Sequence, residues 1–70
     1  MARSKLKRKR ISLNLTQQEV ADLIGITRSY YTEIENGKRG CKIQIWLKIA
    51  KVFDIPDSEL IPYITEGIKK

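Results

Sequence analysis

The chain has 70 residues, enough for one domain around a single compact core. Its 14 lysines and arginines against 8 aspartates and glutamates give a formal net charge of +6, which favours an anionic partner such as nucleic acid, although solubility alone would explain it equally well. The chain has one cysteine, Cys41, and no histidine, so we expect no disulfide, metal site, cofactor or enzymatic activity, and we interpret Cys41 as a buried or half-buried structural thiol.

Neither a membrane span nor a secretory signal is predicted. No apolar run is long enough to cross a bilayer, and the basic N-terminus is not followed by the apolar stretch of a signal peptide. We therefore expect a cytoplasmic protein with no membrane partner.

The first predicted helix, about residues 3–13, is strongly basic. Leu6, Arg10 and Leu13 are spaced i, i+4 and i+7, so Arg10 lies on the same stripe as two apolar residues. A charged side chain on such a stripe needs a partner if it is buried. The pattern leaves open whether the other basic residues of this segment contact DNA or are solvated. These residues are Arg3, Lys5, Lys7, Arg8 and Lys9.

Two short helices with a tight turn between them are predicted next. Thr16-Gln17-Gln18-Glu19 has the pattern of a capping box, and Gly25 ends this helix because a residue without a Cβ adopts the left-handed conformation cheaply. Thr27 caps the following helix, residues 28–36, which Gly37 closes. This spacing indicates a helix-turn-helix. The expected apolar face of the first of these helices consists of Val20, Ala21, Leu23 and Ile24.

A basic loop over residues 38–42 leads to a helix over about 43–53. Its apolar stripe is assigned to the core and consists of Ile43, Trp46, Ile49, Ala50 and Phe53. Asp54-Ile55-Pro56 breaks this helix, and Pro56 opens a last short helix over residues 57–61. Pro62 is expected to interrupt the helical structure again, which leaves Tyr63, Ile64 and Ile68 in an apolar tail without an assigned place in the core.

The run TQQEVADLIGITRSYYTEIENGKRG, followed by LKIAKVFDI, resembles the phage repressor/Cro-type helix-turn-helix family, also called the XRE family. The resemblance covers roughly residues 6–61. It implies an all-α, compact five-helix repressor-like domain with its helix-turn-helix at the second and third helices. Residues 1–70 would form this single domain, with a core over about 6–61 and an apolar and basic tail over 62–70.

The resemblance also implies a DNA-binding surface. Its base-reading positions are Arg28, Ser29, Thr32 and Glu33, where arginine suits guanine and glutamate suits cytosine. The positions that contact the DNA backbone are Gln17, Tyr30, Asn36, Lys38, Arg39 and Lys42. Tyr31 falls where a core residue is usual. Arg10 and Glu35 are placed together as a largely buried ion pair that ties the first helix to the end of the third.

We predict a sequence-specific transcriptional regulator that binds double-stranded DNA, acts as a repressor and reads the major groove as a homodimer. No small-molecule ligand is expected. The C-terminal apolar residues either form the dimer surface or pack as an extra helix on their own domain. The candidates for the dimer surface are Leu60, Ile61, Tyr63 and Ile64.

Two other functions are weighed against this prediction. A protein-interaction module, such as an antitoxin that holds a partner protein, is favoured by the apolar tail and opposed by the full set of DNA-facing polar residues. RNA binding through the lysine-rich N-terminus has only its charge in support, since the sequence offers no aromatic stacking platform. Phage, restriction-modification and chromosomal regulators share this pattern.

Overall fold

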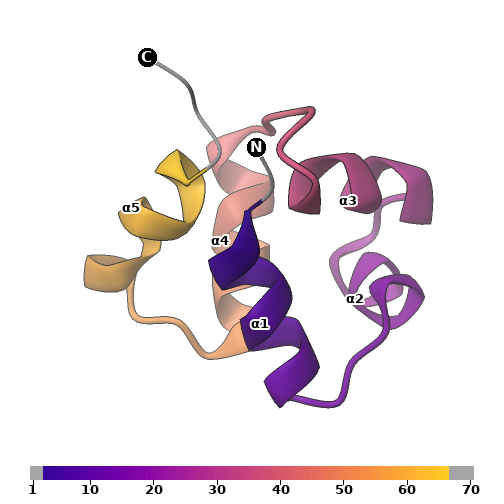
Figure 1. The fold of residues 1–70 in the computed structure, drawn as a ribbon, viewed down its shortest axis with the longest axis horizontal. Helices are drawn as coiled ribbons and strands as arrows, with labels where there is room; N and C mark the ends of the chain where they lie inside the picture. Colours follow the sequence, from indigo (N-terminus) through magenta and orange to yellow (C-terminus); the bar gives the residue numbers. More distant parts are fainter. Residues whose placement is uncertain (1–2, 67–70) are drawn as a thin grey trace.

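A computed structural model describes residues 3–66 of the chain. These residues form helices joined by short connections and contain no strand, which confirms the predicted all-α fold. In Figure 1, α1 lies in front of α4, with α2 and α3 on one side and α5 on the other. The five helices of this part of the chain are α1 (Ser4–Ser12), α2 (Gln17–Ile24), α3 (Arg28–Glu35), α4 (Ile43–Phe53) and α5 (Asp57–Thr65).

The helix-turn-helix is set by local side-chain chemistry. The Thr16 hydroxyl accepts a hydrogen bond from the Glu19 amide at 3.0 Å, and Glu19 Oε1 accepts one from the Thr16 amide at 2.8 Å. This confirms the predicted capping box at the start of α2. Gly25 ends α2 in the left-handed conformation, with φ of 80°. Thr27 then accepts a hydrogen bond from the Tyr30 amide at 3.1 Å and starts α3.

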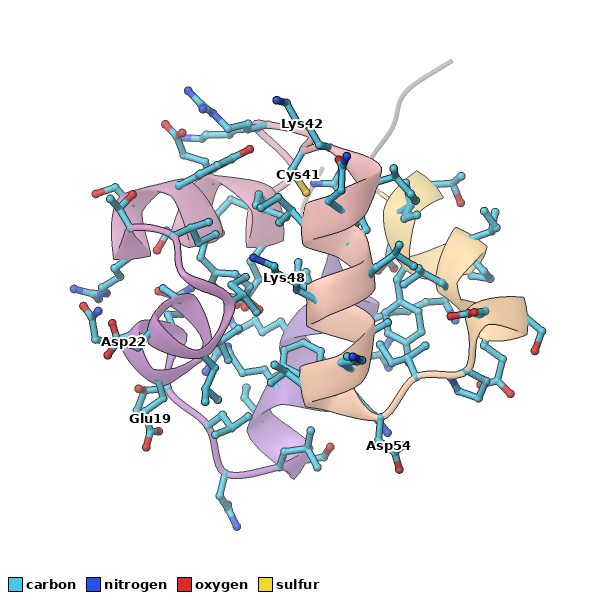
Figure 2. The ribbon with its side chains drawn as sticks, turned by 180° about the vertical axis from the view of Figure 1, so that it is seen from behind. Glu19, Asp22, Cys41, Lys42, Lys48 and Asp54 are labelled. Carbon is cyan, nitrogen blue, oxygen red and sulfur yellow. The ribbon has the colours of Figure 1, made fainter. Side chains whose placement is uncertain are left out.

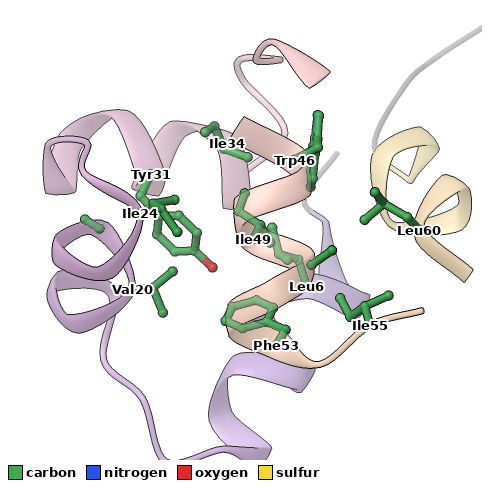
Figure 3. Close-up of a cluster of buried hydrophobic side chains, with 12 residues drawn as sticks. Leu6, Val20, Ile24, Tyr31, Ile34, Trp46, Ile49, Phe53, Ile55 and Leu60 are labelled. Atoms are coloured by element: carbon green, nitrogen blue, oxygen red, sulfur yellow. The ribbon is translucent and has the colours of Figure 1, made fainter. Parts of the chain in front are cut away.

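Helix α4 is the central element of the fold. Seen from behind, it runs from the loop that carries Cys41 and Lys42 to Asp54 at its other end (Figure 2). The core forms along this helix (Figure 3). Helices α2 and α5 pack directly against α4, while α3 packs against α2 and α1. The buried apolar side chains are Leu6, Val20, Ala21, Ile24, Tyr31, Ile34, Trp46, Ile49, Ala50, Phe53, Ile55 and Leu60.

Three apolar residues assigned to buried faces are exposed instead. Ile43 is 56% exposed, because it begins α4 and lies before the stripe that starts at Trp46. Leu23 is 63% exposed, because one residue turns an α-helix by about 100° and Ile24 already points inward. Leu13 is 40% exposed, since α1 ends at Ser12 and the chain leaves the direction of the helix there. In each case the predicted apolar stripe included a residue that the core does not cover.

The prediction that Pro62 interrupts the chain is wrong, because α5 continues through it to Thr65. Leu60 lies in the core at 4% exposure, and Tyr63 and Ile64 are half-buried against it. This packing offsets the backbone hydrogen bond that proline cannot donate. Of the predicted tail, Ile68 lies outside the described residues.

Within residues 3–66 no helix is both long and apolar enough to span a lipid bilayer.

Candidate nucleic-acid interface

Helix α3 has one buried and one exposed face. Tyr31, Ile34 and Glu35 are buried against the rest of the domain. The opposite face holds the predicted base-reading residues, of which Arg28, Ser29 and Glu33 are exposed and Thr32 is half-buried. The turn at Gly25 and the packing of α2 against α3 together set the position of the exposed face of α3 relative to the start of α2.

Two open hollows adjoin each other on this side of the molecule. One lies along the exposed face of α3 and is lined by Arg28, Ser29, Thr32, Glu33, Asn36 and Lys38. The other lies at the start of α2 and is lined by Arg10, Leu15, Thr16, Gln17, Gln18 and Arg28. Arg28 borders both hollows. The structure therefore brings the predicted base-reading residues, Gln17, Asn36 and Lys38 into one polar surface.

Gln17 connects the two helices of this surface. Its Oε1 accepts a hydrogen bond from the Thr32 hydroxyl at 3.1 Å, and its Nε2 donates to Glu35 Oε1 at 3.3 Å. Gln17 stands at the first position of α2, where the helix dipole and free amides favour an anion. The bond to Gln17 also orients the Thr32 hydroxyl toward α2.

Arg10 and Glu35 form an ion pair beneath this surface. Arg10 Nε lies 2.8 Å from Glu35 Oε2, and its Nη2 lies 3.1 Å from Glu35 Oε1. A third donor, Nη1, reaches the Leu15 carbonyl oxygen at 2.8 Å. The two residues are 9% and 2% exposed, so the two-pronged contact is shielded from water. It holds α1 against the end of α3.

The buried pair has shifted acid-base properties. Burial raises the pKa of the Glu35 carboxyl, but the polar groups around it, chiefly the hydrogen bond from Arg10, hold that pKa below its usual range. The Arg10 pKa is raised, chiefly by its hydrogen bond to Glu35. Tyr31 lies close by, and burial together with the Glu35 charge raises its pKa. Within residues 3–66 the buried Tyr31 hydroxyl has no hydrogen-bond partner.

The exposed face of α3 carries a second, more open ion pair. Arg39 Nε lies 3.0 Å from Glu33 Oε1, and the two side chains are 55% and 48% exposed. The Arg39 guanidinium also stacks on Tyr30, 4.9 Å from the centre of its ring. Arg39 therefore offsets part of the negative charge that Glu33 brings to a surface with an otherwise basic rim.

The remaining predicted backbone contacts surround the loop between α3 and α4. Asn36 is the C-cap of α3 and Lys42 the N-cap of α4, and both are exposed, as is Lys38. Cys41 in the same loop is half-buried, and burial raises the pKa of its thiol to about 11. The interpretation of Cys41 as a half-buried thiol agrees with this position.

Sequence reasoning missed Arg3, which is 4% exposed. It was counted among the basic residues of the first segment without an assigned role. A signal was available, because Arg3, Leu6 and Arg10 are spaced i, i+3 and i+7 and so continue the buried stripe of α1 toward the N-terminus.

Comparison with known proteins identifies the family of the chain. The helix-turn-helix (HTH_3) family matches residues 6–60. A cryptic phage CTXphi transcriptional repressor of Vibrio cholerae is 34% identical over 87% of the chain, which spans 55% of that protein's length. An uncharacterised helix-turn-helix regulator of Bacillus subtilis is 43% identical over 73% of the chain and 67% of its own length. An uncharacterised helix-turn-helix regulator of Archaeoglobus fulgidus is 35% identical over 94% of the chain and 93% of its own length.

The fold and the paired helices define a helix-turn-helix domain. The chain belongs to the XRE-type helix-turn-helix family of transcriptional regulators. This family is a class of DNA-binding regulators and not a class of enzymes. The resemblance on which the sequence prediction rested is thereby confirmed.

Proposed function

We infer that the protein is a sequence-specific regulator that binds double-stranded DNA with α3 in the major groove. The observation that carries this proposal is the single polar surface formed by the exposed face of α3 and the start of α2, with Arg28 bordering both hollows. Arginine pairs with guanine through two hydrogen bonds in the major groove. Such a protein would act in the cytoplasm.

The roles of the individual residues follow from their positions. Arg28 and Ser29 lie at the start of α3, the end of a recognition helix that usually contacts base edges. Gln17 at the start of α2 is suited to a phosphate. Glu33 would accept a hydrogen bond from cytosine, and Arg39 would lower its repulsion from the DNA backbone.

We propose that the protein binds as a homodimer and represses transcription. One module of this size contacts few base pairs, and a two-fold symmetric dimer doubles the site. Ile61 on α5 is 61% exposed and is the one dimer candidate that its own domain leaves largely uncovered within residues 3–66. Repression is proposed because the matched protein of V. cholerae is named a repressor.

The proposal is tested by selecting genomic fragments with the purified protein and measuring binding to the best fragment over a series of salt concentrations. A two-fold symmetric site with half-sites about one helical turn apart is the expected result. Weak binding that depends strongly on salt and not on sequence would contradict it. A protein that co-purifies in equal amount, in place of DNA binding, would favour the antitoxin-like alternative.

A further inference from the structure

Arg3 lies where the start of α1 meets α3, the loop after α3, and α5. The start of α1 lies beside the end of α3 and the loop that follows it (Figure 1). Arg3 Nη1 donates to the carbonyl oxygens of Ile34 at 2.6 Å and Arg39 at 3.1 Å. Its Nε donates to the carbonyl oxygen of Ile64 on α5 at 3.3 Å. Its backbone amide donates to the Glu35 carbonyl oxygen at 2.9 Å.

The Arg3 side chain is a buried cation held by dipoles. Within residues 3–66 it forms no ion pair with a carboxylate. Its charge is stabilised by the Ile34 carbonyl, in the last turn of α3 where the helix dipole is negative, and by the Trp46 ring, whose centre is 5.2 Å away. Breaking these contacts while the side chain stays buried is costly, so they hold Arg3 in one arrangement.

This arrangement reaches the exposed surface through Arg39. Arg3 binds the backbone of Arg39, while the Arg39 side chain pairs with Glu33 and stacks on Tyr30. Arg39 lies in the loop between α3 and α4, which also carries Lys38 and Lys42. The backbone of the basic loop is thus tied to the interior by a residue far away in the sequence.

We propose that Arg3 is a positioning residue for the DNA interface. It does not contact DNA but fixes the loop over residues 37–42, so that Lys38, Arg39 and Lys42 are held in place before DNA binds. A loop that is already ordered loses less conformational entropy on binding. This inference rests on the proposed function, and the first of its two tests does not require DNA.

The first test uses Cys41 as a probe of the loop. The rate of labelling by a thiol reagent is measured under native conditions for the wild type and for Arg3→Ala. We expect the variant to react at least about tenfold faster, since loss of a hydrogen bond to a charged group shifts a local equilibrium by that factor or more. Loss of the Arg3 charge alone would slow labelling, because that charge lowers the pKa of Cys41. A faster rate therefore reports an opened loop.

Two further variants separate positioning from general stability. Arg3→Lys keeps the positive charge but loses the planar guanidinium group with its several donors. We expect its labelling rate to lie between those of the wild type and Arg3→Ala. Phe53→Leu removes buried volume at the opposite end of α4 from the loop (Figure 3), and we expect a labelling rate close to that of the wild type in the folded protein.

The second test measures affinity for a short mixed-sequence DNA duplex at several salt concentrations, under conditions where circular dichroism shows every variant folded. Arg3→Ala is expected to bind about tenfold more weakly than Phe53→Leu, with a salt slope smaller by about one.

The outcomes are distinguishable. An unchanged labelling rate in Arg3→Ala, or an equal increase of the rate in Phe53→Leu, would contradict the claim that Arg3 fixes the loop over residues 37–42. Faster labelling with unchanged DNA affinity would overturn the positioning role. Absence of DNA binding by the wild type would overturn the proposed function itself, whatever the labelling rates.

Discussion

The two faces of α3 differ in what holds them. The inner face is buried, and Glu35 there is fixed by Arg10 from α1 and by Gln17 from α2. The outer face carries Arg28, Ser29 and Glu33 in water, and the ion pair between Glu33 and Arg39 is about half exposed. Substitutions on the inner face should therefore change stability, and those on the outer face should change binding.

Under the proposed function, this division would let one fold serve different DNA sequences. Exposed ion pairs contribute about 1 kcal/mol or less, so the outer face can change without unfolding the domain. A buried pair that loses one partner leaves a charge without compensation. Gln17 joins the two faces, because it bonds both to the buried Glu35 and to Thr32, which lines the hollow on the outer face.

The largest effect is expected for Arg10→Ala. The substitution leaves Glu35 buried without its countercharge and should lower the free energy of unfolding by about 3–5 kcal/mol. Arg8→Ala, an exposed change on the same helix, is the matched control and should stay within about 0.5 kcal/mol of the wild type. Urea unfolding measures both. An unchanged free energy of unfolding for Arg10→Ala would contradict the claim that the inner face depends on this pair.

A smaller effect is expected from acid. Since the folded-state pKa of Glu35 lies below its unfolded value, its contribution is present above the unfolded pKa and is lost as the pH falls through the folded one. Stability should fall as the pH drops from about 5 through and below the ordinary range of carboxyl pKa values, and less so in Glu35→Gln. Thermal unfolding over this range is the measurement. If the stability of the wild type and of Glu35→Gln fell equally with pH, Glu35 would not be the cause of the acid sensitivity.

A gain is expected for Tyr31→Phe. The Tyr31 hydroxyl is buried and lacks a hydrogen-bond partner within residues 3–66, so its removal should raise stability by about 1 kcal/mol. Tyr63→Phe, at a half-buried position on α5, serves as the control. A loss of stability in Tyr31→Phe would mean that the hydroxyl bonds to the Arg10–Glu35 pair in solution.

The smallest change in stability is expected for Glu33→Gln on the outer face. The free energy of unfolding should stay within about 0.5 kcal/mol of the wild type, because the pair with Arg39 is about half exposed. Base preference should shift from cytosine toward adenine at one position of each half-site. Selection of DNA sequences by the variant tests this, and an unchanged preference would remove Glu33 from the base-reading set.

The parts of the fold that local chemistry determines could be predicted. The capping box at Thr16, the left-handed Gly25 and the cap at Thr27 each act within a few residues, so the helix-turn-helix followed from the sequence. The position of Arg10 on an apolar stripe likewise pointed to a buried charge that needs a partner.

The parts that depend on distant segments could not be predicted. The hydrogen-bond acceptors of Arg3 are backbone carbonyls of Ile34, Arg39 and Ile64, which no side-chain pattern identifies. Packing against the core carries α5 through Pro62, where local propensity alone would end the helix. The pairing of Arg39 with Glu33 depends on the path of the loop and not on helical spacing.

The most direct test of this account is a paired measurement on Arg28→Ala. Its free energy of unfolding and its affinity for the selected DNA site are compared with those of the wild type. We predict unchanged stability, a loss of roughly 1–3 kcal/mol in binding and relaxed preference at one position of each half-site. Equal weakening on every sequence, or a loss of stability as large as the loss of binding, would contradict the assignment of the outer face of α3 to base reading.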